Sequence, residues 1–79
     1  MTTIRFFAAA RAAVGLDETT TDAHTLDDAL RAVRADDPER WTALQERCSY
    51  LVDGVSTRDR STPLTGVALV DVMPPFAGG

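Results

Sequence analysis

The chain has 79 residues, a formal net charge of −4 and an apolar content of 44%, which suits one globular domain with a single small core. The acidic balance argues against nucleic acid as a partner, because a phosphate backbone rewards clustered cations. Apolar runs are far shorter than the roughly 20 residues that span a membrane. The N-terminus lacks the basic start and cleavage site of a signal peptide, so we expect a soluble cytoplasmic protein with no membrane partner.

Residues 2–8 predict a first strand. Ile4 and Phe6 fall on one face of it, and Arg5 and Phe7 fall on the other, as the period of two requires. Phe7 has two interpretations, since aromatic side chains are often buried but also anchor interfaces. It either packs under a helix or stands exposed as an anchor for a partner.

A helical turn, an edge strand and two helices follow in sequence. Residues 9–14 form a short alanine-rich helical turn that Gly15 closes as a C-cap. The polar, β-prone run 19–22 suits an edge strand. The main helix begins after Thr25, a good N-cap, and a second helix begins at Pro38. The apolar stripe of the main helix has the spacing i, i+3, i+4, i+7 and consists of Leu26, Ala29, Leu30 and Val33.

The C-terminal third predicts the remaining strands. Residues 49–53 form one strand, the Asp53-Gly54 turn returns a short strand at 55–56, and residues 67–73 form the last. The last strand is apolar except at Asp71, which is typical of a central strand covered on both faces, and we expect it beside the first strand. This order predicts an α+β domain with a mixed sheet of four to five strands and one main helix. The β-grasp (ubiquitin-like) arrangement fits it, although other small α+β topologies share the order.

Metal binding and nucleophilic catalysis find little support in the sequence. Cys48 and His24 are the single cysteine and histidine, so there is no cysteine cluster for zinc or iron–sulfur ligation. A catalytic triad would have to use His24, which lies in a loop-like stretch without an elbow motif. We therefore expect no metal, and we interpret Cys48 as a small buried apolar residue rather than a sulfur relay.

The chain ends in the run Pro74-Pro-Phe-Ala-Gly-Gly79, directly after the last predicted strand. The prolines stiffen the exit from the sheet, and the glycines are slim and adopt backbone angles closed to other residues. Such an end suits a carboxylate that enters a narrow pocket on another protein, whereas a frayed terminus is the alternative. We divide the chain into a domain at 1–75 and a flexible tail at 76–79.

Two motifs resemble the small subunit of molybdopterin synthase. The opening Ile4-Arg-Phe-Phe-Ala-Ala-Ala-Arg11, followed by Val14-Gly15, is similar to that family's hydrophobic strand ending in Phe-Ala, then arginine, then glycine. The run Met73-Pro-Pro-Phe-Ala-Gly-Gly79 is similar to its Pro-Pro-x-x-Gly-Gly terminus. Ala12 stands where the family usually has an acid, and the turn Leu64-Thr-Gly66 lacks the family's acidic residues. Related sulfur carriers of thiamin, cysteine and tungsten-cofactor pathways also end in Gly-Gly on a ubiquitin-like fold.

The resemblance implies a carried nucleophile. An ATP-dependent, E1-like activating enzyme would adenylate the carboxylate of Gly79, and sulfur would replace AMP to give a thiocarboxylate. ATP belongs to that enzyme, and we expect no cofactor bound to this chain. The large synthase subunit would then bind the tail, so that the sulfur attacks a pyranopterin precursor in molybdenum cofactor biosynthesis. The expected partner contacts are Phe7, Pro75, Phe76, Ala77 and Gly78.

The chain itself is therefore interpreted as a non-catalytic, sulfur-donating subunit. One alternative is a carrier for another of the sulfur pathways. Another is a ubiquitin-like modifier joined to target lysines through Gly79, and a third is a β-grasp interaction module with an inert tail. The chain contains no lysine, since all eight basic residues are arginines, so it cannot build lysine-linked polymers of itself. This weighs only weakly against the modifier.

Overall fold

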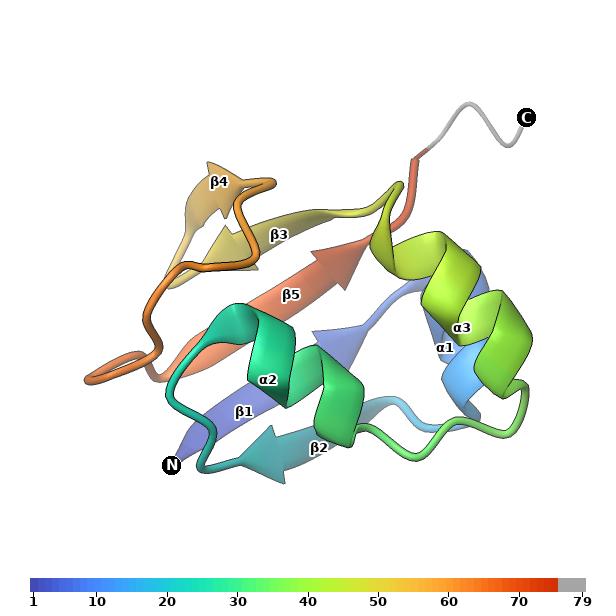
Figure 1. Cartoon of the computed structure of the whole chain (residues 1–79), viewed down its shortest axis with the longest axis horizontal. Helices are drawn as coiled ribbons and strands as arrows, with labels where there is room; N and C mark the ends of the chain where they lie inside the picture. The colour runs from blue at the N-terminus through green and yellow to red at the C-terminus, as the bar shows by residue number, and fades with distance from the viewer. Residues whose placement is uncertain (76–79) are drawn as a thin grey trace.

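The chain folds into a five-stranded mixed sheet with helices packed on one face (Figure 1). The structure is a computed structural model and describes residues 1–75. The strands are β1 (Thr2–Phe6), β2 (Glu18–Thr21), β3 (Ser49–Val52), β4 (Val55–Thr57) and β5 (Leu69–Met73). The helices of the described part are α1 (Ala8–Val14), α2 (Leu26–Ala32) and α3 (Pro38–Gln45).

The strand order is β2-β1-β5-β3-β4, which confirms that the last strand is central and lies beside the first. β1 and β5 run parallel, with Phe6 opposite Val72, and the other neighbouring strands of the described part are antiparallel. The prediction that β5 is covered on both faces was wrong. Val70 and Val72 are fully buried under the helices, whereas Leu69 and Met73 on the other face stay half-buried, because the helices of the described part pack on one face.

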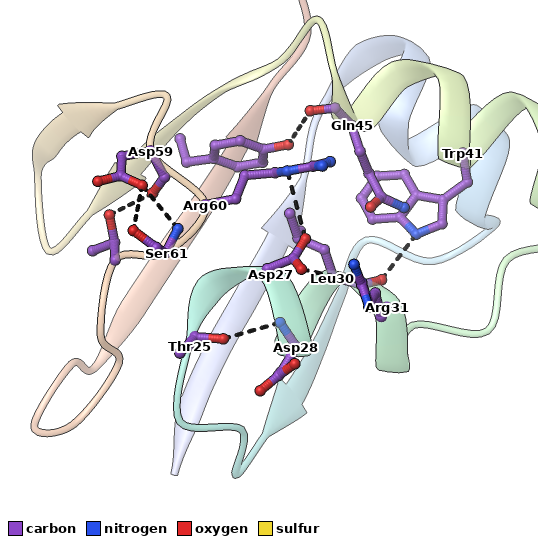
Figure 2. A network of polar contacts seen from close by, with 12 residues as sticks. Thr25, Asp27, Asp28, Leu30, Arg31, Trp41, Gln45, Asp59, Arg60 and Ser61 are labelled. Atoms are coloured by element: carbon purple, nitrogen blue, oxygen red, sulfur yellow. Dashed lines mark hydrogen bonds and ion pairs between the residues drawn. The ribbon is translucent and has the colours of Figure 1, made fainter.

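The core lies between the sheet and the three helices. The Phe6 and Trp41 rings meet edge to face, with centroids 5.6 Å apart and planes at 86°. The polar atoms of the large aromatic side chains are satisfied, as burial requires. Trp41 Nε1 donates to the Leu30 carbonyl at 3.2 Å, and the Tyr50 hydroxyl donates to the Gln45 carbonyl at 2.7 Å (Figure 2).

Helices α2 and α3 begin where the sequence predicts, and α2 ends earlier, whereas α1 begins one residue before its predicted start and ends at Val14 as predicted. Thr25 caps α2 by accepting the Asp28 N–H at 3.2 Å. Val33 follows α2 with extended backbone angles but still packs against the core. The sequence predicted one main helix, but the three helices are similar in length, with seven, seven and eight residues. Both α2 and α3 therefore cover the sheet. Pro38 disfavours helical angles at the residue before it, which separates α3 from α2. Within residues 1–75 no helix is long and apolar enough to cross a membrane.

Gly15, at the end of α1, contacts the segment that connects α2 to α3. It ends α1 with a left-handed φ of 88°, as predicted, and its N–H donates to the Arg11 carbonyl at 2.8 Å. The Asp36 carboxylate lies directly over Gly15, where any Cβ would collide with it. The Asp36 N–H also donates to the Val14 carbonyl at 3.2 Å. The left-handed φ and the nearby carboxylate together favour glycine at this position.

Asp53 fixes the turn between β3 and β4. Asp53 and Gly54 have φ of 48° and 85°, which confirms the tight turn predicted from the Asp-Gly pair. The Asp53 carboxylate reaches the start of β5, where it accepts the N–H groups of Ala68 at 3.1 Å and Leu69 at 2.9 Å. One side chain thus connects three strands.

The loop before β5 is anchored to the start of α2 (Figure 2). The Asp27 N–H donates to the Arg60 carbonyl at 2.7 Å, and the Arg60 side chain pairs with the Asp27 carboxylate at 3.5 Å. The same carboxylate pairs with Arg31 at 3.1 Å. Within the loop, hydrogen bonds from Ser61 hold the pKa of Asp59 below its ordinary value. These contacts order a segment whose sequence predicts only a polar loop.

Candidate functional site

The candidate site is the end of the sheet at which β1 and β5 finish. Phe6 pairs with Val72 in parallel register, so Phe7 and Met73 leave their strands at the same edge. β5 then continues into Pro74 and an exposed Pro75 (Figure 1). The segment that leads to the C-terminus therefore departs beside Phe7.

Phe7 is exposed at 37%, whereas its neighbour Phe6 is exposed at 2%. This confirms that Phe7 lies on the face of β1 that points away from the core. Its backbone is extended, and the next residue, Ala8, has a φ of 49°. A left-handed residue other than glycine costs about 1–2 kcal/mol and is often found at functional sites. Nothing in the sequence signals this conformation at Ala8.

Arg5 and Asp71 form a bidentate ion pair on the same face. Arg5 Nε lies 2.7 Å from Asp71 Oδ1, and Nη2 lies 3.0 Å from Oδ2. The two residues are opposite one another in the β1–β5 register. The hydrogen bond to Asp71, together with its charge, raises the pKa of Arg5 above its ordinary value. The guanidinium carbon also lies 5.7 Å from the centre of the Phe7 ring, within cation–π range.

We name this surface the docking face and define it by Arg5, Phe7, Leu51, Asp71 and Met73. Leu51 lies opposite Asp71 on β3, and Met73 follows Asp71 on the same face of β5. Both apolar side chains are half-buried. The docking face therefore combines an aromatic ring, apolar side chains and one ion pair next to the exit of the chain.

Sequence reasoning placed Phe7 on this face but missed the Arg5–Asp71 pair. Asp71 was treated only as an interruption of an apolar strand. The available signal was an arginine at an outward position of the first strand and an acid in the strand expected beside it. Recognising the pair needs the register of the two strands, which residue types alone do not give.

Four of the predicted site residues lie outside the described residues, namely Phe76, Ala77, Gly78 and Gly79. Their roles stay predictions, as does the division into a domain at 1–75 and a tail at 76–79. Pro75 is described and exposed, and its contact with a partner is likewise a prediction.

Cys48 lies in the core near this end of the sheet, with 1% exposure. Burial raises the pKa of its thiol to about 11. A thiol with such a pKa is almost entirely protonated at neutral pH and is a poor nucleophile. Its burial agrees with the interpretation of Cys48 as a small core residue.

Comparison with known families gives a match over nearly the whole chain. A sequence model of the ThiS family matches residues 4–79. The comparison with individual curated proteins gave no match. The mixed five-stranded sheet with its helical layer is the β-grasp fold of that family. Sulfur carriers of the family typically work with an E1-like adenylating enzyme and a partner synthase. By fold and by sequence match, the chain belongs to the ThiS family of ubiquitin-like sulfur carriers.

Proposed function

We propose that the chain is the small subunit of molybdopterin synthase and carries sulfur as a thiocarboxylate on Gly79. The family match, which extends to residue 79, supports the sulfur-carrier part of the proposal. The resemblance of the opening and closing motifs supports the molybdenum cofactor pathway. The position of β5, which leads the chain out beside the exposed Phe7, supports a tail that is presented together with a docking face.

The proposed chemistry begins with a carboxylate, which is a poor electrophile. The adenylating enzyme joins the Gly79 carboxylate to AMP from ATP and releases pyrophosphate. Hydrosulfide then attacks the acyl carbon, the bond to AMP breaks, AMP leaves, and a thiocarboxylate remains without any change of oxidation state. The thiocarboxylate sulfur is the nucleophile that attacks the pyranopterin precursor.

In this scheme the chain supplies position rather than catalytic groups. Cys48 is buried and protonated, so the sulfur goes to Gly79 without a relay through its thiol. Pro75 stiffens the exit from β5, and Phe7 is a partner anchor at the same edge. Catalysis then depends on how the partner aligns the carried sulfur with its substrate.

The test is to incubate the chain with its cognate adenylating enzyme, ATP and sodium sulfide, and to measure its intact mass. We expect a gain equal to the mass difference between sulfur and oxygen. The matched control is Cys48→Ser, which should load equally well. Exclusive formation of conjugates with other proteins would support the modifier and contradict the carrier.

The pathway is tested with the loaded chain. We expect the large synthase subunit to consume the thiocarboxylate when a pyranopterin precursor is present. Consumption only by a thiazole-forming enzyme would instead assign the chain to thiamin biosynthesis. Both experiments start from the same thiocarboxylate-loaded protein. A negative result with one enzyme therefore cannot be caused by a failure to load sulfur.

The length of the tail gives a second test. Deleting Gly79, or adding one residue after it, should abolish sulfur transfer because the reacting carboxylate no longer reaches its position. Terminal residues usually contribute few core contacts, so the melting temperature should change little. A large drop in melting temperature would mean that the tail is structural.

A further inference from the structure

The Arg5–Asp71 pair occupies an unexpected place. β5 is the central strand, and on the docking face Asp71 lies between half-buried Leu69 and Met73, with Leu51 across from it. Only 12% of the Asp71 side chain is exposed. A carboxylate is costly to bury at such a position unless it is paired. Arg5 supplies that partner from the opposite residue of β1.

The pair contributes little net stability. Exposed ion pairs typically contribute little to stability, and buried pairs can often be replaced by neutral residues without loss. The Arg5 side chain is 44% exposed, so its attraction to Asp71 is partly screened by water. Neutral side chains at both positions would support the sheet about as well. Folding alone therefore does not explain the pair.

The pair leaves part of Arg5 available to a partner. Asp71 accepts hydrogen bonds from Nε and Nη2, which fixes the guanidinium plane. A guanidinium has five N–H donors, and these two bonds are the hydrogen bonds that the Arg5 side chain makes within residues 1–75. A protein that covers the docking face without offering acceptors would leave buried N–H donors unsatisfied, which would weaken its binding.

The surrounding charges indicate which acceptor fits. Arg5 lies opposite Asp71 on one side and Glu18 on the other, so this row of the sheet carries one positive and two negative charges. A further carboxylate would be repelled by both acids. A neutral oxygen, from a main-chain carbonyl or a side-chain amide, can accept from Arg5 without that repulsion.

We propose that the Arg5–Asp71 pair is the selectivity element of the docking face. Its occupant is the protein that receives the tail, which covers Phe7 with an apolar surface and offers neutral acceptor oxygens to Arg5. The pair selects against proteins whose matching surface is entirely apolar, because they leave Arg5 unsatisfied. This inference rests on the proposed function, since it assumes that a tail-receiving partner exists.

The main test uses Arg5→Thr combined with Asp71→Thr, which removes both charges and keeps good strand residues. The dissociation constant for the purified large synthase subunit is measured by calorimetry. We expect binding to weaken more than tenfold while the melting temperature stays within a few degrees. Unchanged affinity, or unfolding of the double variant, would overturn the inference. The control Arg31→Met removes a cation from α2 and should bind like the unmodified chain.

A second variant keeps the charge and changes only the geometry. Arg5→Lys can still pair with Asp71 but lacks the planar fork, so we expect a loss of affinity of at least threefold with an unchanged melt. Affinity equal to that of the unmodified chain would show that only the charge matters and would contradict the inference.

Salt dependence tests the neutral acceptor. For an uncharged partner oxygen, the affinity that the Arg5→Thr, Asp71→Thr double variant loses should change little with salt, because this variant keeps the net charge of the unmodified chain and the acceptor carries no charge. A loss that shrinks at high salt would indicate a screened attraction between Arg5 and a partner carboxylate and would overturn this part. The sulfide loading assay separates the two proposals, since its failure in the unmodified chain would refute sulfur carriage itself.

Discussion

The two faces of the sheet differ although they are built from alternate residues of the same strands. Five side chains of the face under the helices are at most 2% exposed, namely Ile4, Phe6, Tyr50, Val70 and Val72. The docking face instead presents an ion pair, an exposed aromatic ring and half-buried apolar groups. Adjacent residues of one strand therefore lie in different environments, and the open face can hold charged groups that the core excludes.

The adjacent phenylalanines test this comparison most strongly. Phe6→Ala removes a ring that packs edge to face on Trp41, and such truncations cost about 3–5 kcal/mol of folding free energy. Small domains have a stability of about 5–15 kcal/mol, so the variant should be close to unfolding. Urea denaturation of both proteins gives the difference.

Phe7→Ala is the matched control, one residue away on the other face. We expect its melt to shift only slightly, while its affinity for the large synthase subunit falls more than tenfold, as for a central aromatic anchor. If Phe7→Ala unfolds as readily as Phe6→Ala, Phe7 is a core residue and the two faces are not distinct.

Much of the fold was predictable because its signals are local. Alternation along residues 2–8 placed Phe6 and Phe7 on opposite faces, and the Asp53-Gly54 pair specified a turn whose angles the structure contains. Capping signals at Thr25 located the start of α2. Each of these features depends on residues within a few positions of one another.

The remaining features are nonlocal. The Arg5–Asp71 bond joins residues 66 positions apart, and its existence depends on the register of β1 against β5. The uncovered face of β5 depends on where the helices pack, which an apolar run at consecutive positions does not specify. The sequence predicts the face on which Phe7 lies. The ion pair beside its ring can be recognised only once the pairing of β1 with β5 is known.

A second prediction concerns the attachment of the helical layer. Gly15→Ala places a methyl group in a left-handed position and against the Asp36 carboxylate, so we expect a loss of about 2 kcal/mol or more. Gly66→Ala is the control, since Gly66 has a φ of 77° with open space where a Cβ would lie, and should lose about 1 kcal/mol. Equal losses would mean that Asp36 simply moves aside. The melts of Gly15→Ala with and without Asp36→Ala measure this contact directly.

A third prediction compares two acids of the sheet. Asp53→Ala leaves the N–H groups of Ala68 and Leu69 without their acceptor, which should cost about 1–2 kcal/mol. Asp53→Asn retains an oxygen and tolerates positive φ, so it should lose less. In contrast, removing Asp71 together with Arg5 should leave the melt nearly unchanged. A similar loss from both acids would show that the docking face also holds the fold together.

The smallest predicted effect is the fall in the free energy of unfolding at alkaline pH, which depends on two side chains of the covered face. The chain has no lysine, so Cys48 and Tyr50 are its side chains other than arginine that titrate in the alkaline range. Burial raises the pKa of the Cys48 thiol to about 11, and it also raises the pKa of Tyr50. Both groups lie in the core, whereas the ionised pair lies on the open face.

The direction follows from proton binding. Above pH 9 the unfolded chain loses the Cys48 proton while the native state retains it up to about pH 11, so deprotonation favours unfolding. The contribution is present below pH 9 and is lost as the pH rises towards 11, with a slope of at most about 1.4 kcal/mol per pH unit for one group. Urea denaturation from pH 8 to 11 should therefore show falling stability, with a shallower slope in Cys48→Ala. Tyr50→Phe should flatten the curve mainly at its upper end, because an unfolded tyrosine loses its proton only near pH 10. If neither substitution changes how the unfolding free energy depends on pH, both side chains are solvated in the native state. The covered face would then exclude water no better than the docking face does.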